Sequence, residues 1–163
     1  MKRQIRQIFV LAIIAIAIFL PVAAQEKMQE VKIYLRKTGA DYASQHPSGW
    51  FEVKRAVDAK SPLRSALEIL TVGSTADEEK NNLSSSTFGI ELVSLRIKNK
   101  TAYTSFTMSG GAAFPGENAP FIFIEAVEKT ALQFKGVKKV VVCLDGVLNF
   151  WSEDDEAPTQ KCK

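Results

Sequence analysis

The chain has 163 residues, of which 46% are hydrophobic and 24% are charged. This length fits one domain, and the apolar content suffices for a buried core, which excludes a predominantly disordered chain. The formal net charge of +3 comes from Lys2, Arg3 and Arg6, because no acidic residue precedes Glu26. The remaining 18 basic and 18 acidic residues balance, so the charge gives no support to nucleic-acid binding.

Residues 1–24 have the three parts of a secretory signal peptide. A basic start is followed by an apolar run and by the small residues Val22-Ala23-Ala24, which suit cleavage before Gln25. The alternative is an uncleaved membrane anchor, since Ile8 to Ala24 just reaches the roughly 17 residues that a spanning helix needs. In both cases we expect export across the cytoplasmic membrane, to the periplasm, to the outer face of that membrane or to the medium. Membrane contact is expected only if this segment is uncleaved.

A polar lead-in at residues 25–30 precedes two predicted strands. Val31 to Leu35 mostly alternates apolar and polar residues, and Trp50 to Val57 again has strand-like composition. Between them, residues 36–49 form a loop of a length that is more often functional than merely connecting.

The first helix is predicted from Pro62, with Ser61 as its cap, to Gly73. Its apolar stripe has helical spacing and consists of Leu63, Ala66, Leu67 and Leu70. Thr75 and Glu78 have the spacing of a capping box and predict a short second turn of helix.

A β-hairpin is predicted next, with Asn99-Lys100 as its turn. Val93, Leu95 and Ile97 alternate with polar residues before the turn, and Ala102, Thr104 and Phe106 do so after it. A Gly- and Pro-rich loop at residues 108–120 then leads into a second helix. This helix is predicted to begin near Asn118 and to end at Gly136, with Ile124, Val127, Ala131 and Phe134 as its stripe.

The last predicted strands flank the tight turn Asp145-Gly146. Val140 to Leu144 is apolar on both faces, which is typical of a central strand, and Val147 to Trp151 is expected to pair back as an edge strand. The elements predict an α+β fold with a small mixed or antiparallel sheet and two helices on one face. The expected order is β-β-α-β-β-α-β-β over residues 31–151, followed by an acidic tail at 152–163.

No constellation of residues predicts catalysis. The sequence has one histidine, His46, which lies in a predicted loop beside Pro47. No histidine is placed to act as the base for Cys143 or for a serine, so we expect neither a Ser-His-Asp nor a Cys-His mechanism within one chain. Ser109-Gly110-Gly111 lacks the ending of a phosphate-binding loop, and the acidic runs 77–79 and 153–156 are typical of solvated faces. We therefore expect no enzyme activity, no cofactor and no metal site.

Two cysteines and four other residues are candidates for other roles. Cys143 and Cys162 either form a disulfide, worth ~3 kcal/mol in an oxidising compartment, or are a buried small side chain and a free tail thiol. Trp50 and Phe114 lie at predicted loop edges and could anchor a partner or a glycan. Asn149 and Trp151 lie on the predicted last strand, whose unpaired backbone groups another chain could complete. The first strand could offer a docking edge in the same way, and the loops 36–50 and 108–120 are further candidate contact surfaces.

The order of these elements resembles the GerMN domain of sporulation and spore-germination GerM-like proteins. The anchors are Leu67 to Leu70 with Gly73-Ser74-Thr75, the hairpin, and Phe134 to Val140 leading to Asp145-Gly146. The chain departs from the family at Thr87 to Ile90, where members commonly have a Pro-containing turn. The resemblance implies a non-catalytic bacterial envelope module that binds an envelope protein or itself. The alternative function is binding of a cell-wall glycan or a small ligand.

Overall fold

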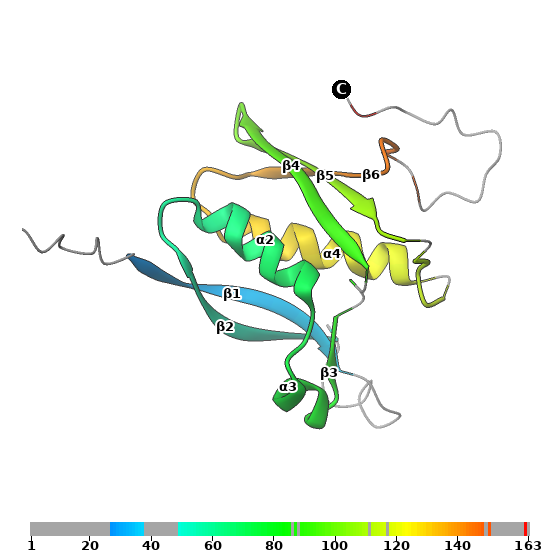
Figure 1. Ribbon diagram of the computed structural model, residues 1–163. Helices are drawn as coiled ribbons and strands as arrows, with labels where there is room; N and C mark the ends of the chain where they lie inside the picture. Colours follow the sequence, from blue (N-terminus) through cyan, green and yellow to red (C-terminus); the bar gives the residue numbers. More distant parts are fainter. Residues whose placement is uncertain are drawn as a thin grey trace, which may run out of the picture.

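The computed structural model describes residues 27–37, 49–85, 87, 89–110, 112–116, 118–148, 150 and 162. The predicted signal segment, His46, Asn149, Trp151 and all of the tail except Cys162 lie outside the described residues. Two three-stranded sheets lie on opposite sides of a layer formed by two helices (Figure 1). We call the sheet formed by β1, β2 and β3 sheet A, and the sheet formed by β4, β5 and β6 sheet B.

Sheet A is antiparallel and contains β1 (Met28–Lys37), β2 (Trp50–Asp58) and β3 (Leu83–Ser84), in the order β2-β1-β3. Alternation decides which side chains enter the core, because successive residues of a strand point to opposite faces. Val31, Ile33 and Leu35 of β1 are buried against the helices. Strand β1 begins at Met28, so part of the predicted lead-in belongs to the sheet.

The helical layer consists of α2 (Pro62–Val72) and α4 (Ala119–Leu132), which contact each other and both sheets. The predicted stripe of α2 is confirmed, since Leu63, Ala66, Leu67 and Leu70 are its buried residues. On α4 the buried stripe differs in part from the predicted one. It consists of Ala119, Phe123, Ala126, Val127, Thr130 and Ala131, while Ile124 is half-buried and Phe134 follows the helix.

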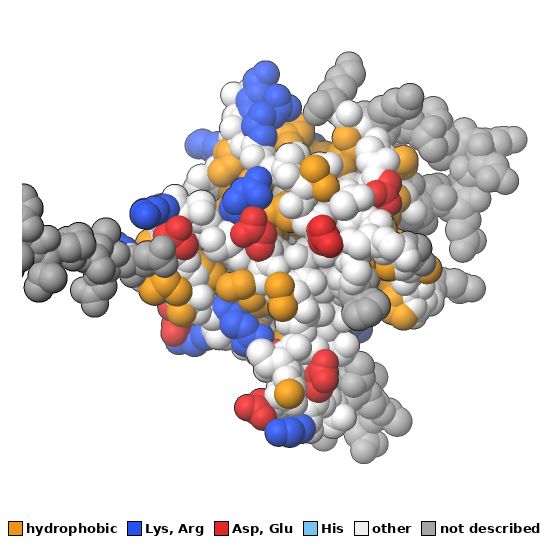
Figure 2. Space-filling view, in the orientation of Figure 1, with side chains coloured by type: hydrophobic (Ala, Val, Ile, Leu, Met, Phe, Trp, Pro, Cys, Tyr) orange, Lys and Arg blue, Asp and Glu red, His pale blue; other side chains and the backbone are white. Residues whose placement is uncertain are grey.

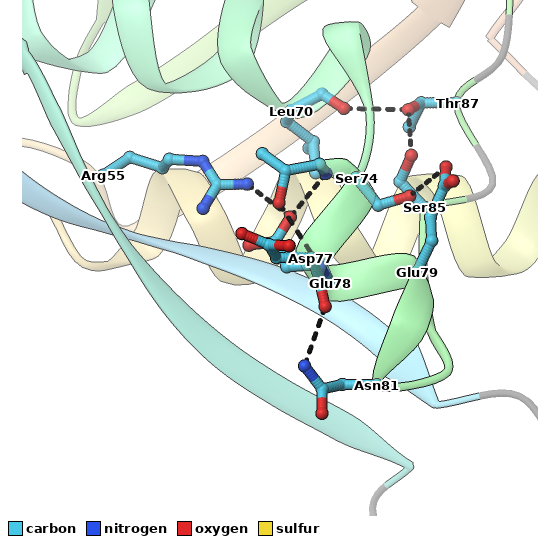
Figure 3. Close-up of polar contacts among 10 residues, drawn as sticks. Arg55, Leu70, Ser74, Asp77, Glu78, Glu79, Asn81, Ser85 and Thr87 are labelled. Atoms are coloured by element: carbon cyan, nitrogen blue, oxygen red, sulfur yellow. Dashed lines mark hydrogen bonds and ion pairs between the residues drawn. The ribbon is translucent and has the colours of Figure 1, made fainter.

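The short helix α3 (Ala76–Lys80) begins with the predicted capping box. Glu78 accepts a hydrogen bond from the Thr75 backbone N–H at 2.7 Å, and its carboxylate also meets Nη2 of Arg55 on β2 at 2.5 Å (Figure 3). Nearby, the buried Thr87 hydroxyl donates to the Leu70 carbonyl at 2.8 Å. These bonds fix the connection between α2 and sheet B, and they give Glu78 a structural role rather than a solvated one.

Sheet B contains β4 (Ile90–Lys98), β5 (Thr101–Met108) and β6 (Lys139–Leu144), in the order β4-β5-β6. Strands β4 and β5 form the predicted hairpin, and both turn residues have positive φ (50° for Asn99, 61° for Lys100), as a type I′ turn requires. Strand β6 runs parallel to β5 after the crossover through α4. A bulge between Leu92 and Ser94 leaves Val93 58% exposed, although alternation alone predicted it to face inward.

The predicted α+β class and the approximate order of elements are confirmed, and the arrangement adds three differences. The strands divide into two sheets because the helices bury apolar stripes on both sides, so each sheet covers one side. Strand β6 is an edge strand rather than a central one. Among the described residues 147, 148 and 150, the predicted last strand is reduced to a single bridge between Leu144 and Val147. None of the described helices is long and apolar enough to cross a membrane.

Candidate interaction surfaces

Trp50 is held by protein groups on several sides. Its indole N–H donates to Oε1 of Glu125 on α4 at 2.7 Å, and the guanidinium of Arg36 lies 5.4 Å from the ring centroid. Nζ of Lys129 lies 5.9 Å from the same ring and 3.5 Å from Glu125. Next to this group, burial raises the pKa of Glu128, and the charge of Glu125 adds to the effect. Trp50 therefore ties the start of β2 to α4.

Phe114 packs into an aromatic cluster. Its ring stacks on Phe150 with centroids 6.1 Å apart and lies 6.0 Å from Phe123, which is fully buried and meets Phe106 edge-on at 5.0 Å. Such a cluster is a packing arrangement. Phe114 therefore helps to close one end of the core.

Cys143 and Cys162 form a disulfide in the structure, with their Cα atoms 6.2 Å apart. The bond places Cys162 on the outer face of β6, where its backbone N–H donates to the Gly146 carbonyl at 3.0 Å. Together with the Leu144–Val147 bridge, this contact covers part of the β6 edge. The two remaining predicted contact residues, Asn149 and Trp151, lie outside the described residues.

The predicted role of the first strand as a docking edge is corrected, because β1 lies in the middle of sheet A. It pairs with β2 along its length and with β3 at Arg36 and Lys37. On the side where β3 is too short to reach, the Gln133 amide accepts from the Lys32 backbone N–H at 2.9 Å and donates to its carbonyl at 2.8 Å. This side chain occupies the backbone groups that a further strand would use.

The charges of sheet A are paired. All five basic residues of β1 and β2 have a partner: Lys32 with Glu52, Lys54 with Glu30, Arg55 with Glu78, Arg36 on Trp50 and Lys37 on Phe51. Hydrogen bonds to Glu52 and Glu30 raise the pKa values of Lys32 and Lys54, which lie directly opposite each other. The flanking glutamates thus offset a repulsion between two lysines.

Sheet B carries basic residues without acidic partners. Six exposed cations gather around its hairpin end, and none makes an ion pair with a described residue: Arg96, Lys98, Lys100, Lys135, Lys138 and Lys139. The Lys138 and Lys139 N–H groups both donate to the Lys100 carbonyl, which brings the two loops together. Figure 2 shows basic side chains at this end of the molecule with no acidic side chain beside them. The lack of acidic neighbours is visible in the sequence, because no acidic residue occurs between Glu91 and Glu117 or between Glu128 and Asp145.

Two hollows adjoin β4. A wide one of about 1040 Å³ lies on the outer face of sheet B, between Arg96, Lys98 and Tyr103 of the hairpin and Leu148 and Cys162. A smaller, apolar one of about 380 Å³ lies under the other face of β4, and Pro62, Leu63, Leu95, Ile97, Phe134 and Val137 line most of it. Sequence reasoning did not single out the β4 edge, because strict alternation placed its apolar residues in the core.

The described residues hold no cluster of side chains that could bind a metal ion. No three His, Cys, Asp or Glu side chains of this part lie close enough to hold a metal ion. The observed clusters are an ion pair within a helix cap, an aromatic group, a disulfide and a strand edge. These features define a two-sheet α+β domain with one surface of unneutralised cations beside an open strand edge.

The family model described as "Germane: Sporulation and spore germination" matches residues 32–149, so the chain belongs to this family and the resemblance to GerMN domains is confirmed. The predicted boundaries of the signal segment (1–24), the lead-in (25–30), the domain (31–151) and the tail (152–163) stay predictions. Among curated proteins, no match was found.

Two solved structures show the same fold. The tandem GerMN domains of the sporulation protein GerM from Bacillus subtilis are 18% identical, with a TM-score of 0.54, and the match covers 77% of this chain but 42% of that one. The first GerMN domain of the same protein is 19% identical, with a TM-score of 0.50, covering 72% of this chain and 84% of that one. The chain thus spans less than half of the tandem protein.

Proposed function

We propose that this chain is an exported, non-catalytic interaction module that takes part in assembling a bacterial cell envelope. The family match over residues 32–149 carries the proposal, because it links this fold to sporulation and spore germination. The open edge and unpaired cations of sheet B provide the surface for such a role. The partner we favour is an envelope protein.

Export is supported by two independent features. Residues 1–24 have the pattern of a signal peptide or anchor. The disulfide between Cys143 and Cys162 suits an oxidising compartment, where such bonds persist. Self-association and glycan binding stay predictions. No observation favours the glycan, because Trp50 and Phe114 are both engaged by protein groups.

Export is tested by adding protease to intact cells and to spheroplasts that carry the full chain with a C-terminal tag. We expect the tag to be digested in spheroplasts, while a matched variant that lacks residues 2–24 stays protected. Protection of the full chain in spheroplasts would contradict export.

Assembly is tested by photo-crosslinking in living cells. A photoreactive residue is placed at exposed sites on each sheet, with Ile97 representing sheet B and Lys54 representing sheet A. We expect a discrete adduct with an envelope protein, identified by mass spectrometry. Failure of every surface position to give an adduct would contradict the interaction role.

A further inference from the structure

We propose that the free edge of β4, from Ser94 to Lys98, binds an extended segment of a partner protein in which apolar and acidic residues alternate. The inference rests on the proposed function and names the surface and the partner chemistry. Three features on this edge carry it: unpaired backbone groups, an apolar hollow on one side and unpaired cations on the other.

The hairpin turn determines which backbone groups are free. In a type I′ turn, the two residues that flank it, Lys98 and Thr101, are joined by the turn hydrogen bond. Hydrogen-bonded pairs alternate along an antiparallel ladder, so Arg96 and Ser94 also face β5. The N–H and C=O groups of Leu95 and Ile97 therefore point away from β5, where β4 has no neighbouring strand. They offer two donors and two acceptors to an added strand.

The hollow beneath the edge suits apolar side chains. Leu95 and Ile97 form its rim, and Leu63, Phe134 and Val137 lie deeper along its lining. Ile97 is 51% exposed, so an added strand could cover its side chain together with that of the half-buried Leu95. Alternate residues of an added strand would face this hollow, because side chains of a strand alternate between its two faces.

The opposite face of the edge suits acidic side chains. Arg96 and Lys98 point to the outer face of sheet B, as Tyr103 and Thr101 do on the paired positions of β5. Lys139 extends the Lys98–Thr101 row across the sheet. The guanidinium of Arg96 lies 5.2 Å from the ring centroid of Tyr103, so Arg96 has an aromatic neighbour. None of these cations has a carboxylate partner among the described residues, so acidic residues of an added strand would meet charges without a counter-ion there.

Two other occupants fit the edge less well. A second copy would bring Arg96 and Lys98 of both chains to one joint edge, where like charges repel. The acidic run of this chain, Glu153 to Glu156, has no apolar residue between its carboxylates and lacks the alternation that the edge requires. The edge therefore favours a segment of a different protein.

The probe is a blocked heptapeptide in which four Asp alternate with Val, Ile and Val, added to the protein in the form in which cells export it. Amide exchange is followed by NMR. We expect exchange at Leu95 and Ile97 to slow by at least about tenfold at saturation, and a peptide of the same composition with all Asp first to bind more weakly. Equal binding of both peptides, or no slowing at these two amides, would overturn the proposal.

Variants separate backbone pairing from simple charge attraction. Ile97→Pro removes a free N–H without touching the β4–β5 ladder and should abolish the slowing at Leu95. Lys98→Glu should weaken binding by about tenfold, whereas Lys54→Glu, the matched reversal on sheet A, should leave it unchanged. If Ile97→Pro does not fold, the peptide affinities of Lys98→Glu and Lys54→Glu still test the proposal. Equal affinities in these two variants would overturn it.

Cellular crosslinking distinguishes this site from the general role. If Lys98→Glu leaves the adducts formed from every position unchanged, the β4 site is wrong while the interaction module stands. If no position forms an adduct in the unaltered chain, the proposed function itself is contradicted.

Discussion

The two sheets cover the same pair of helices, yet they differ in how they treat charge and edges. In sheet A every basic residue of β1 and β2 has an acidic or aromatic partner, and the Gln133 amide occupies the backbone groups of Lys32 on β1. The outer side of β2 pairs with no described strand. In sheet B six cations have no described ion-pair partner, and β4 keeps free backbone groups beside exposed Val93 and Ile97.

We take this difference as support for the proposed docking at β4. A strand edge that is blocked and neutralised is protected against pairing with other chains. The edge of β4 is open to another chain, because its outward backbone groups pair with no described strand and its cations have no described carboxylate partner. The shared helical layer supports both sheets, so binding at sheet B need not involve sheet A.

Removing the shared support should have the largest effect. Phe123 of α4 is fully buried and contacts Phe106 of β5, so Phe123→Ala leaves a cavity in the core. We expect a loss of about 3–5 kcal/mol in the free energy of unfolding, measured by urea denaturation. Phe121→Ala on the 51% exposed position of the same helix is the control, with a loss below about 1 kcal/mol. Similar losses in both variants would contradict a shared core.

Breaking the disulfide should destabilise sheet B through β6. The bond closes a loop between residues 19 positions apart, which corresponds to ~3 kcal/mol in the chain-entropy model. We expect Cys162→Ser to lower the urea midpoint by an amount that corresponds to this loss in the free energy of unfolding. Reductant should lower the midpoint of the unaltered protein in the same way and leave the variant unchanged. If reductant leaves the urea midpoint of the unaltered protein unchanged, the disulfide between Cys143 and Cys162 is contradicted.

Local patterns predicted most elements, because they depend on neighbouring residues alone. The stripe of α2, the capping box at Thr75 and the turn at Asn99-Lys100 all follow from short-range spacing, and each is confirmed. The apolar run of β6 was assigned to a sheet centre because burial on both faces was its only visible feature. Its outer face is instead covered by Cys162, which no local pattern places there.

The candidate surfaces could not be predicted in the same way, because they depend on contacts between residues that are distant in sequence. Trp50 was predicted as a free anchor because its partner, Glu125, lies 75 residues away. The bulge that exposes Val93 has no glycine to mark it. The gap in acidic residues around β4 and β6 was visible in the sequence, but only the pairing of β5 with β6 brings Lys98 and Lys139 into one row.

Sheet A should also be distinguished by its response to acid. The hydrogen bond from Arg55 lowers the pKa of Glu78, with Thr75 adding to the effect, so ionised Glu78 stabilises the fold. This contribution is complete above the ordinary glutamate pKa of 4.5 and is lost as the pH falls below it, through the lowered pKa. We expect Glu78→Gln to cost about 1–2 kcal/mol at pH 7, and the difference from the unaltered protein to shrink progressively as the pH falls below 4.5. A difference that is constant between pH 7 and pH 3 would contradict the ion pair.

The smallest effect should be the sharpest test of the comparison, because equal charge reversals should act with opposite signs on the two sheets. Lys54→Glu loses the ion pair with Glu30 and places a carboxylate near Glu30 and Glu52, so the unfolding midpoint should fall. Lys32, which lies opposite, offsets this loss only in part, because its effect on the pKa of Lys54 is smaller than that of the two glutamates. Lys98→Glu places one among Lys100 and Lys139, so the midpoint should rise slightly.

Thermal melts at low salt measure both shifts, and both should shrink in 1 M salt, because exposed charges are screened there. A shift of the same sign in both variants would mean that the charge environments of the two sheets are alike. Opposite signs would instead show that the cations at the hairpin end repel one another in the free protein. An acidic partner that binds β4 would relieve this repulsion, so the protein–peptide complex should lose affinity as salt rises.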